Sequence, residues 1–130
     1  MARALGFPLK TRFLVADDFR PWREQLRSIL DTRQEWTIVG EACDGQEAVE
    51  KATEMQPDII LLDVGMPVLN GIKAAKIICR KCPKSKILFV TQDADDDIRN
   101  AAMQAGASAF LQKKNAGKEL LDAITYVLYR

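Results

Sequence analysis

Short apolar runs alternate along the chain with longer segments in which apolar residues recur every three or four positions. The apolar runs have the length of strands and lack an alternating polar face, which is typical of a parallel sheet covered on both sides. The longer segments have the spacing of helices with one buried face. We expect strands at 13–16, 37–39, 59–62, 87–90 and 109–111, and helices around 22–30, 48–55, 72–79, 98–105 and 120–128. Five such β-α units predict a doubly wound α/β domain.

Turn and capping residues agree with these boundaries. Asn70 stands where the third helix begins and is a candidate N-cap, and Pro83 disfavours helix in the residue before it. Gly106 falls where the fourth helix must stop, a position that favours a residue able to adopt positive φ. Residues 1–11 show no pattern, so we expect an N-terminal tail (1–11) followed by one domain (12–130) of ordinary size.

Composition excludes several classes of function. The 130-residue chain has no histidine, three cysteines and a formal net charge of +1. Without histidine, residues of this chain alone cannot perform Ser-His-Asp or Cys-His catalysis or form a His-ligated zinc site. The even charge balance gives no sign of nucleic-acid binding, and no apolar run approaches the ~20 residues of a membrane span. Few cysteines, in odd number, are typical of a reducing compartment. We expect a cytoplasmic domain without direct contact with nucleic acid or membrane.

Polar residues stand at the ends of four predicted strands. Asp17 and Asp18 follow the first strand, Asp63 the third, Thr91 the fourth and Lys113 the fifth. The carboxyl ends of parallel strands meet at one edge of the sheet, where ligands bind in this class of fold. Three neighbouring carboxylates need a cation, and oxygen ligands without His or Cys favour Mg²⁺. With a hydroxyl and an ammonium group beside Asp63, the pattern predicts a phosphoryl-transfer site in which an aspartate takes the phosphoryl group.

Each of these residues also has a purely structural interpretation. An acidic residue after a strand is often a helix N-cap, which applies to Asp18. Thr91 can be an ordinary strand-end residue, and Lys113 a solvated loop lysine. Asp63 resists this interpretation because it directly follows Ile-Ile-Leu-Leu, where a charge needs a partner. Five such residues at matching positions make the functional interpretation the stronger one.

Four segments together resemble the receiver domain of bacterial response regulators. They are FLVADD at 13–18, DIILLDVGMPVLNG at 58–71, FVT at 89–91 and GASAFLQK at 106–113. The resemblance extends from about residue 12 to 128, and the stretch from Gly106 onward is most similar to the receivers of LuxR/NarL-type regulators. It implies a flavodoxin-like fold with five helices and strand order 2-1-3-4-5. It also implies regulation of transcription through an output domain absent from this chain.

The resemblance assigns roles to the acidic residues. Asp63 would be the phosphoacceptor, modified by a sensor histidine kinase or a phosphotransfer protein that carries the phosphohistidine. Asp17, Asp18, Asp63 and the backbone carbonyl of Gly65 would hold Mg²⁺ as a cofactor. As in the family, the chain would be no enzyme beyond its own phosphorylation and dephosphorylation.

The resemblance also implies a switch. Lys113 would pair with the phosphoryl oxygens and Thr91 would donate a hydrogen bond to them, while Phe110 matches the aromatic residue that rotates inward as the threonine moves. Because Thr91 and Lys113 would bind the phosphorylated state better than the free one, they would shift a two-state equilibrium. The face formed by the fourth helix, fifth strand and fifth helix would then change its affinity for partners.

Several positions depart from the usual receiver pattern. Gln92 stands where the family prefers a small residue, which would narrow access to Asp63. Lys114 replaces a common proline, so no cis peptide is expected there. Gly65 and Asp93, together with Gln92, occupy positions that tune the lifetime of the phosphoryl group in the family. Their combined effect has no predicted sign.

Exposed residues indicate partners, and other functions stay open. Phe19 and Trp22 lie beside the acidic pair, where the family docks its kinase, and Trp22 suits the core equally well. Tyr126 and Tyr129 suit a homodimer or an output domain. The alternative function is a degenerate receiver that acts as a phosphorylation-independent dimerisation or docking module, which Gln92 alone favours. A Mg²⁺-dependent phosphatase is a more distant alternative.

Two further motifs are discounted. Cys79 and Cys82 form a lone C-x-x-C at the end of a helix, and with one further cysteine and no histidine they cannot complete a zinc site. Their expected role is packing. The acidic run 93–97 starts like a calcium-binding loop but lacks its glycine and its bidentate glutamate, so we expect it to form the first turn of the fourth helix.

Overall fold

The computed structural model of the chain describes residues 10–92 and 95–129. Its centre is a parallel sheet of five strands in the order β2-β1-β3-β4-β5. The strands are β1 (Thr11–Ala16), β2 (Trp36–Ala42), β3 (Ile59–Leu62), β4 (Lys86–Thr91) and β5 (Ala109–Gln112). The doubly wound fold that the apolar pattern predicts and the strand order that the resemblance implies are therefore confirmed.

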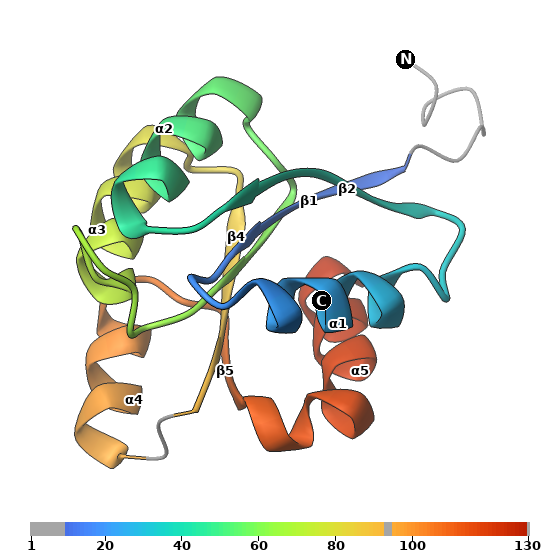
Figure 1. Cartoon of the computed structure of the whole chain (residues 1–130). Coiled ribbons are helices and arrows are strands. Elements are labelled where there is room, and N and C mark those ends of the chain that lie inside the picture. Colours follow the sequence, from blue (N-terminus) through green and yellow to red (C-terminus); the bar gives the residue numbers. More distant parts are fainter. Residues whose placement is uncertain (1–9, 93–94, 130) are drawn as a thin grey trace.

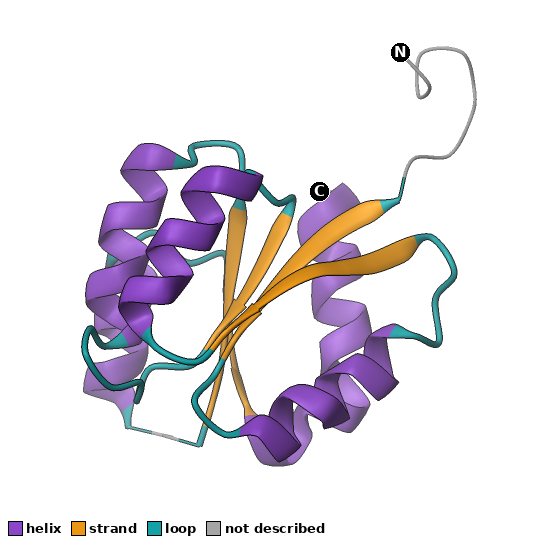
Figure 2. Ribbon diagram, turned by 45° about the horizontal axis from the view of Figure 1, so that its top comes forward, coloured by secondary structure: helices purple, strands orange, loops and turns teal. Residues whose placement is uncertain are grey.

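Helices cover both faces of the sheet. They are α1 (Arg20–Leu30), α2 (Gly45–Met55), α3 (Gly71–Lys81), α4 (Asp96–Gln104) and α5 (Ala116–Tyr129), with a 3-10 turn, η1 (Lys113–Asn115), before α5. Helices α1 and α5 lie on one face, and α2, α3 and α4 lie on the other (Figures 1 and 2). Because all strand pairs are parallel, the carboxyl ends of the strands share one edge. Within the described ranges, no helix has the length and apolarity that a membrane crossing requires.

The central strands pack against helices on both faces of the sheet. All positions of β3 are buried, and successive side chains of a strand point to opposite faces. Phe13 and Val15 of β1 therefore pack toward α1 and α5, whereas Leu14 and Ala16 pack toward α2, α3 and α4. Each face of the sheet thereby has its own apolar cluster, and the sheet is held between them.

Capping residues set the helix ends where the sequence predicts them. Asn70 and Asp95 accept hydrogen bonds from backbone N–H groups in the first turns of α3 and α4. Helix α3 ends at Lys81, and Cys82 is its C-cap directly before the proline. Gly106 follows α4 with φ of 108°, a conformation that glycine adopts without strain. Within the described residues, the acidic start of α4 is confirmed as well.

The structure differs from the sequence-based boundaries in β2 and at the start of β1. Strand β2 spans seven residues, Trp36–Ala42, whereas the apolar run predicts only 37–39. It is an edge strand whose middle is half-exposed, so Gly40 and Glu41 belong to it although they interrupt the apolar run. Strand β1 begins at Thr11, the last residue of the predicted tail. Lys10 is exposed, and residues 1–9 of that tail lie outside the described part of the chain.

Candidate functional site

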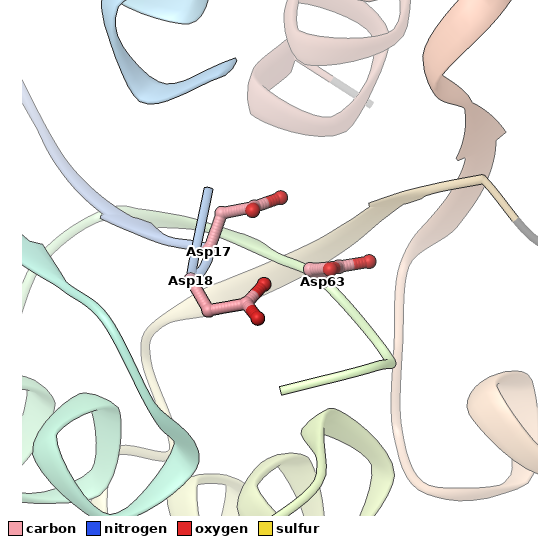
Figure 3. A group of neighbouring side chains, drawn as sticks. All are labelled: Asp17, Asp18 and Asp63. Carbon is pink, nitrogen blue, oxygen red and sulfur yellow. The ribbon is translucent and has the colours of Figure 1, made fainter. Parts of the chain in front are cut away.

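Three aspartates meet at the carboxyl edge of the sheet. Asp17 and Asp18 directly follow β1, and Asp63 directly follows β3. These two strands pair so that Ala16 lies opposite Leu62, which makes the next residues of both strands neighbours. One carboxylate oxygen from each aspartate lies within 4.8 Å of the others, and Figure 3 shows the three carboxylates side by side. The sequence-based expectation that these residues come together is met.

The three aspartates differ in their surroundings. Asp17 is 1% exposed and Asp63 is 7% exposed, whereas Asp18 is open to solvent. Oδ1 of Asp17 accepts a hydrogen bond of 2.8 Å from the N–H of Phe19. Burial raises the pKa of Asp17, opposed by the hydrogen bonds from Lys113 and Phe19 and assisted by the nearby charge of Asp63. Because burial is the largest cause, ionised Asp17 carries a desolvation cost that a cation would relieve.

Lys113 supplies positive charge beside the cluster. It directly follows β5 and begins η1. Its Nζ lies 2.7 Å from Oδ2 of Asp17 and 3.8 Å from Oδ2 of Asp63, and its side chain is only 13% exposed. The ammonium group therefore pairs closely with Asp17 and loosely with Asp63, which leaves Asp63 the less neutralised of the two buried carboxylates.

A pocket of about 380 Å³ opens beside Asp63. Its lining comes from several strand ends and loops, namely Asp18, Phe19, Asp63, Gly65, Thr91, Gln92 and Lys113. Thr91 is the last residue of β4 and is 1% exposed. The hydroxyl, the ammonium and two of the carboxylates that the sequence singles out thus share one cavity. Asp17 is not among the lining residues, although one of its carboxylate oxygens lies within 4.8 Å of one from Asp18 and one from Asp63.

The loop that follows Asp63 is held by a close backbone contact. The N–H of Gly71 donates a hydrogen bond of 2.8 Å to the carbonyl of Val64. A Cβ at position 71 would collide with the backbone carbonyl of Asp63, so a residue without a side chain is required where α3 begins. Gly65, by contrast, is exposed, and a Cβ there would meet no atom. Val68 has φ of 69° and is 82% exposed.

Phe110 lies on the α4 side of β5. It stands opposite Phe89 in the register of β4 and β5, and the two ring centroids are 6.3 Å apart. The guanidinium carbon of Arg99, from α4, lies 5.7 Å from the centre of the Phe110 ring. Phe110 is partly buried against the apolar cluster of α2, α3 and α4. Its role as a switch stays a prediction.

The residues that depart from the usual receiver pattern lie at the surface where they are described. Gln92 is exposed and lines the pocket. Lys114 is exposed as well, and the peptide bonds of the described residues include no cis bond. Asp93 lies outside the described residues, so its influence on the phosphoryl group stays a prediction.

Two residues of α1 contact the site, one at the backbone of Asp17 and one at Lys113, although the sequence pattern assigned neither of these contacts. Nη1 of Arg23 donates a hydrogen bond of 2.6 Å to the backbone carbonyl of Asp17, and its Nε donates one of 2.9 Å to Glu41. Trp22 is 8% exposed, and the centre of its ring lies 5.4 Å from Nζ of Lys113. Both residues lie in the first turn of the helix that follows the acidic pair. Because that turn has to pack near the end of β1, their position in the sequence could have indicated these contacts.

The remaining candidate contact residues are at the surface. Phe19 is 59% exposed and lines both the site pocket and a second pocket of about 570 Å³, which Trp22 also lines. Tyr126 and Tyr129 on α5 are 63% and 77% exposed. Their exposure is compatible with a partner surface, and their role stays a prediction.

Cys79 and Cys82 are free thiols at the end of α3. Burial raises the pKa of both, and Sγ of Cys79 donates a hydrogen bond of 3.3 Å to the carbonyl of Ala105. A raised pKa disfavours the thiolate form that metal binding and redox chemistry need. These contacts agree with the expected packing role.

The cluster of aspartates fits a magnesium ion. All of its donor groups are carboxylates, which Mg²⁺ prefers over softer ligands. Oδ2 of Asp17 is buried and, apart from its contact with the ammonium group of Lys113, has no hydrogen-bond partner among the described residues. A buried carboxylate oxygen with unused acceptor capacity, next to two further carboxylates, is suited to a divalent cation.

Comparison with known proteins assigns the fold and the site to one family. Residues 13–125 match the response regulator receiver domain. The transcriptional regulatory protein LnrK of Bacillus subtilis (strain 168) is 37% identical over 116 residues, 89% of this chain and 53% of LnrK. Protein CcdB of the same organism is 36% identical over 118 residues, 91% of this chain and 98% of CcdB. The signal receiver domain of the putative response regulator NarL from Mycobacterium tuberculosis superposes with a TM-score of 0.87 at 31% identity, covering 95% of this chain and 100% of that one. The chain belongs to the response regulator receiver family.

The relatives differ in length. The chain spans about half the length of LnrK and of other transcriptional regulators that it matches, but nearly the whole of CcdB. The match therefore establishes a receiver domain of two-component signalling with transcriptional regulators among its relatives.

Proposed function

We propose that this receiver domain accepts a phosphoryl group on Asp63 from the phosphohistidine of a sensor histidine kinase or a phosphotransfer protein, in a Mg²⁺-dependent reaction. The observation that carries the proposal is the pocket that Asp63 shares with Thr91 and Lys113, with two further carboxylates close by. Of the two buried aspartates, Asp63 lines the pocket and is the less tightly paired with the lysine. It is therefore the carboxylate available to an incoming phosphoryl group.

The reaction is a displacement at phosphorus. A carboxylate oxygen of Asp63 attacks, an O–P bond forms, and the N–P bond of the phosphohistidine breaks. The electron pair of the broken bond stays on the imidazole, which takes up a proton and leaves. The product on this chain is an acyl phosphate.

Positioning and charge neutralisation supply most of the catalysis in such a transfer. Asp17, Asp18, Asp63 and the backbone carbonyl of Gly65 are the groups that would hold Mg²⁺, and the bound ion would supply positive charge to the phosphoryl oxygens. Lys113, whose ammonium group lies 3.8 Å from Oδ2 of Asp63, adds a second positive charge, and the hydroxyl of Thr91 donates a hydrogen bond to the phosphoryl group.

The same contacts make the modification a signal. Phosphorylation adds roughly −1.5 to −2 charges and strong acceptor oxygens at Asp63. Lys113 and Thr91 gain interactions only in that state, so they shift a two-state equilibrium toward it. Thr91 ends β4, whose neighbour β5 carries Phe110, so the shift reaches the face formed by α4, β5 and α5. In a longer protein, that face would control an output domain and transcription.

A docking module that needs no phosphorylation is the weaker candidate. Its support is Gln92, which is exposed at the pocket. The pocket that Gln92 lines is also lined by Asp63, Thr91 and Lys113. Gln92 therefore does not replace any group that the transfer needs. Together with Gly65 and Asp93, Gln92 is better suited to setting the lifetime of the acyl phosphate.

Incubation with Mg²⁺ and acetyl phosphate, followed by intact-mass spectrometry, tests the proposal. The wild-type chain should gain the mass of one phosphoryl group, and the Asp63→Asn protein should gain none. Asp58→Asn is the matched control, because it makes the same change at the other end of β3, where the carboxylate binds the backbone N–H of Arg12. It should be phosphorylated like the wild type. A wild-type chain that takes no phosphoryl group, or an Asp63→Asn chain that takes one, would contradict the proposal.

A further inference from the structure

The ammonium group of Lys113 contacts an aromatic ring as well as a carboxylate. It lies 2.7 Å from Oδ2 of Asp17 and 5.4 Å from the centre of the Trp22 ring. Trp22 is 8% exposed and the lysine side chain 13% exposed, so both are largely removed from water. A cation over an indole face is attracted by the ring, most strongly where the pair is desolvated.

Core packing alone explains a tryptophan poorly at this position. Nε1 of Trp22 is buried and has no hydrogen-bond partner among the described residues. An unpaired buried N–H costs free energy that phenylalanine or leucine would avoid. What tryptophan offers in return is the ring face most attractive to a cation, and Lys113 is the cation that lies over it.

We propose that Trp22 is a positioning residue for phosphoryl transfer and that it acts through Lys113. This inference rests on the proposed function. A lysine side chain is flexible, and its ammonium group is a compact, strongly hydrated charge. The ring restricts that charge to a place 3.8 Å from Oδ2 of Asp63. From there it reaches a phosphoryl group on Asp63 with little rearrangement and little further loss of side-chain entropy.

Two smaller apolar substitutions separate the aromatic face of Trp22 from its apolar character. Trp22→Phe keeps an aromatic face, whereas Trp22→Leu keeps an apolar side chain without one. In the presence of Mg²⁺, we expect beryllofluoride, an analogue of the phosphoryl group, to bind about tenfold more weakly to the Trp22→Leu protein than to wild type. The Trp22→Phe protein should retain most of the affinity. Isothermal titration calorimetry measures the binding, and circular dichroism checks folding. If Trp22→Leu does not fold, Trp22→Met takes its place, since methionine adapts to irregular space.

Trp36 provides the matched control. It is the other tryptophan of the chain, it is 6% exposed, and the guanidinium carbon of Arg33 lies 5.3 Å from the centre of its ring. It stands at the start of β2, at the amino edge of the sheet. Trp36→Leu should lower the stability of the fold and leave beryllofluoride affinity unchanged. General destabilisation is then excluded as the cause of the Trp22→Leu effect.

A double-mutant cycle tests whether Trp22 acts through the lysine. In the Lys113→Met background, Trp22→Leu should change beryllofluoride affinity by less than about twofold. The inference is overturned if Trp22→Leu and Trp22→Phe bind the analogue equally well, or if the Trp22→Leu effect persists undiminished in the Lys113→Met protein. A wild-type chain that binds no beryllofluoride would instead refute the proposed function, so the two failures are distinguishable.

Discussion

Strand β3 has an aspartate at each end, and the fold surrounds the two very differently. Oδ2 of Asp58, just before the strand, accepts the N–H of Arg12 at 2.8 Å, and the Asp58 backbone bonds to Arg12 and Lys86, each at 2.9 Å. Asp63, just after the strand, lines a pocket, and the ammonium of Lys113 lies 3.8 Å away. An aspartate whose partners come from the backbone stabilises the fold, whereas one with unused acceptor capacity is available to a ligand.

The turns on either side of β3 show the same contrast. Gln56 precedes the strand with φ of 47°, and Val68 follows it with φ of 69°. The side chain of Gln56 donates hydrogen bonds to the carbonyls of Thr53 and Lys81, which offset its unfavourable backbone. Val68 is β-branched, for which positive φ is a marked outlier, and it is 82% exposed. The amino edge of the sheet is arranged for stability, while the carboxyl edge holds strain and unbalanced charge.

The largest expected difference between the two edges is the effect on Mg²⁺ affinity of removing one carboxylate charge from each. Asp17→Asn takes one carboxylate from the cluster at nearly constant size. We expect it to weaken Mg²⁺ binding roughly 100-fold, which corresponds to about 2.8 kcal/mol. Asp58→Asn makes the same change at the amino edge and should leave Mg²⁺ affinity as it is. Isothermal titration calorimetry measures both, and equal affinities for the Asp17→Asn and wild-type chains would remove Asp17 from the metal site.

The free energy of unfolding should be more sensitive to loss of the aspartate at the amino edge than to loss of Asp63. Asp58→Ala removes the acceptor of the Arg12 N–H, and we expect it to lower the free energy of unfolding by about 1–2 kcal/mol. Asp63→Ala removes a charge that opposes ionisation of Asp17. Without Mg²⁺ it should therefore leave the free energy of unfolding unchanged or raise it by up to about 1 kcal/mol. Urea denaturation in the presence of EDTA measures both variants. Equal losses would show that the two edges do not differ in this way.

The smallest expected difference is in the free energy of unfolding when each of the two positive-φ residues is replaced by glycine. Val68→Gly removes backbone strain from an exposed position and should raise the free energy of unfolding by about 0.5–1 kcal/mol, after the entropy cost of glycine is subtracted. Gln56→Gly relieves the same kind of strain but also loses the side-chain hydrogen bonds, so it should not stabilise the fold. Thermal and urea denaturation compare them. A Val68→Gly chain less stable than wild type would mean that the loop stores no strain.

The central part of the fold follows from the sequence because its strands are buried on both faces. Segments 59–62 and 87–90 are continuous apolar runs, and they form the buried part of β3 and β4. The same criterion predicts β2 too short, because the middle of this strand is half-exposed and includes Gly40 and Glu41. A pattern of burial can find a strand only where the strand is buried.

The members of the candidate site could be predicted, but not their pairing. Topology brings the ends of β1, β3 and β5 to one edge, so Asp17, Asp63 and Lys113 meet as expected. The preference of the lysine for Asp17, and its contact with Trp22, depend on side-chain distances that no spacing in the sequence encodes. The contact of Arg23 with the Asp17 backbone depends in the same way on how α1 packs against the sheet.

Gly71 joins the start of α3 to the backbone of Asp63 with no room for a further atom between them. Backbone segments in direct contact transmit a displacement to each other, whereas a layer of side chains between them would absorb part of it by changing rotamers. A displacement of the backbone at Asp63 would therefore press directly on the first residue of α3, the helix that ends at Lys81. The helix extends roughly 16 Å, so this contact links the acidic cluster to a part of the surface that lies far from the pocket.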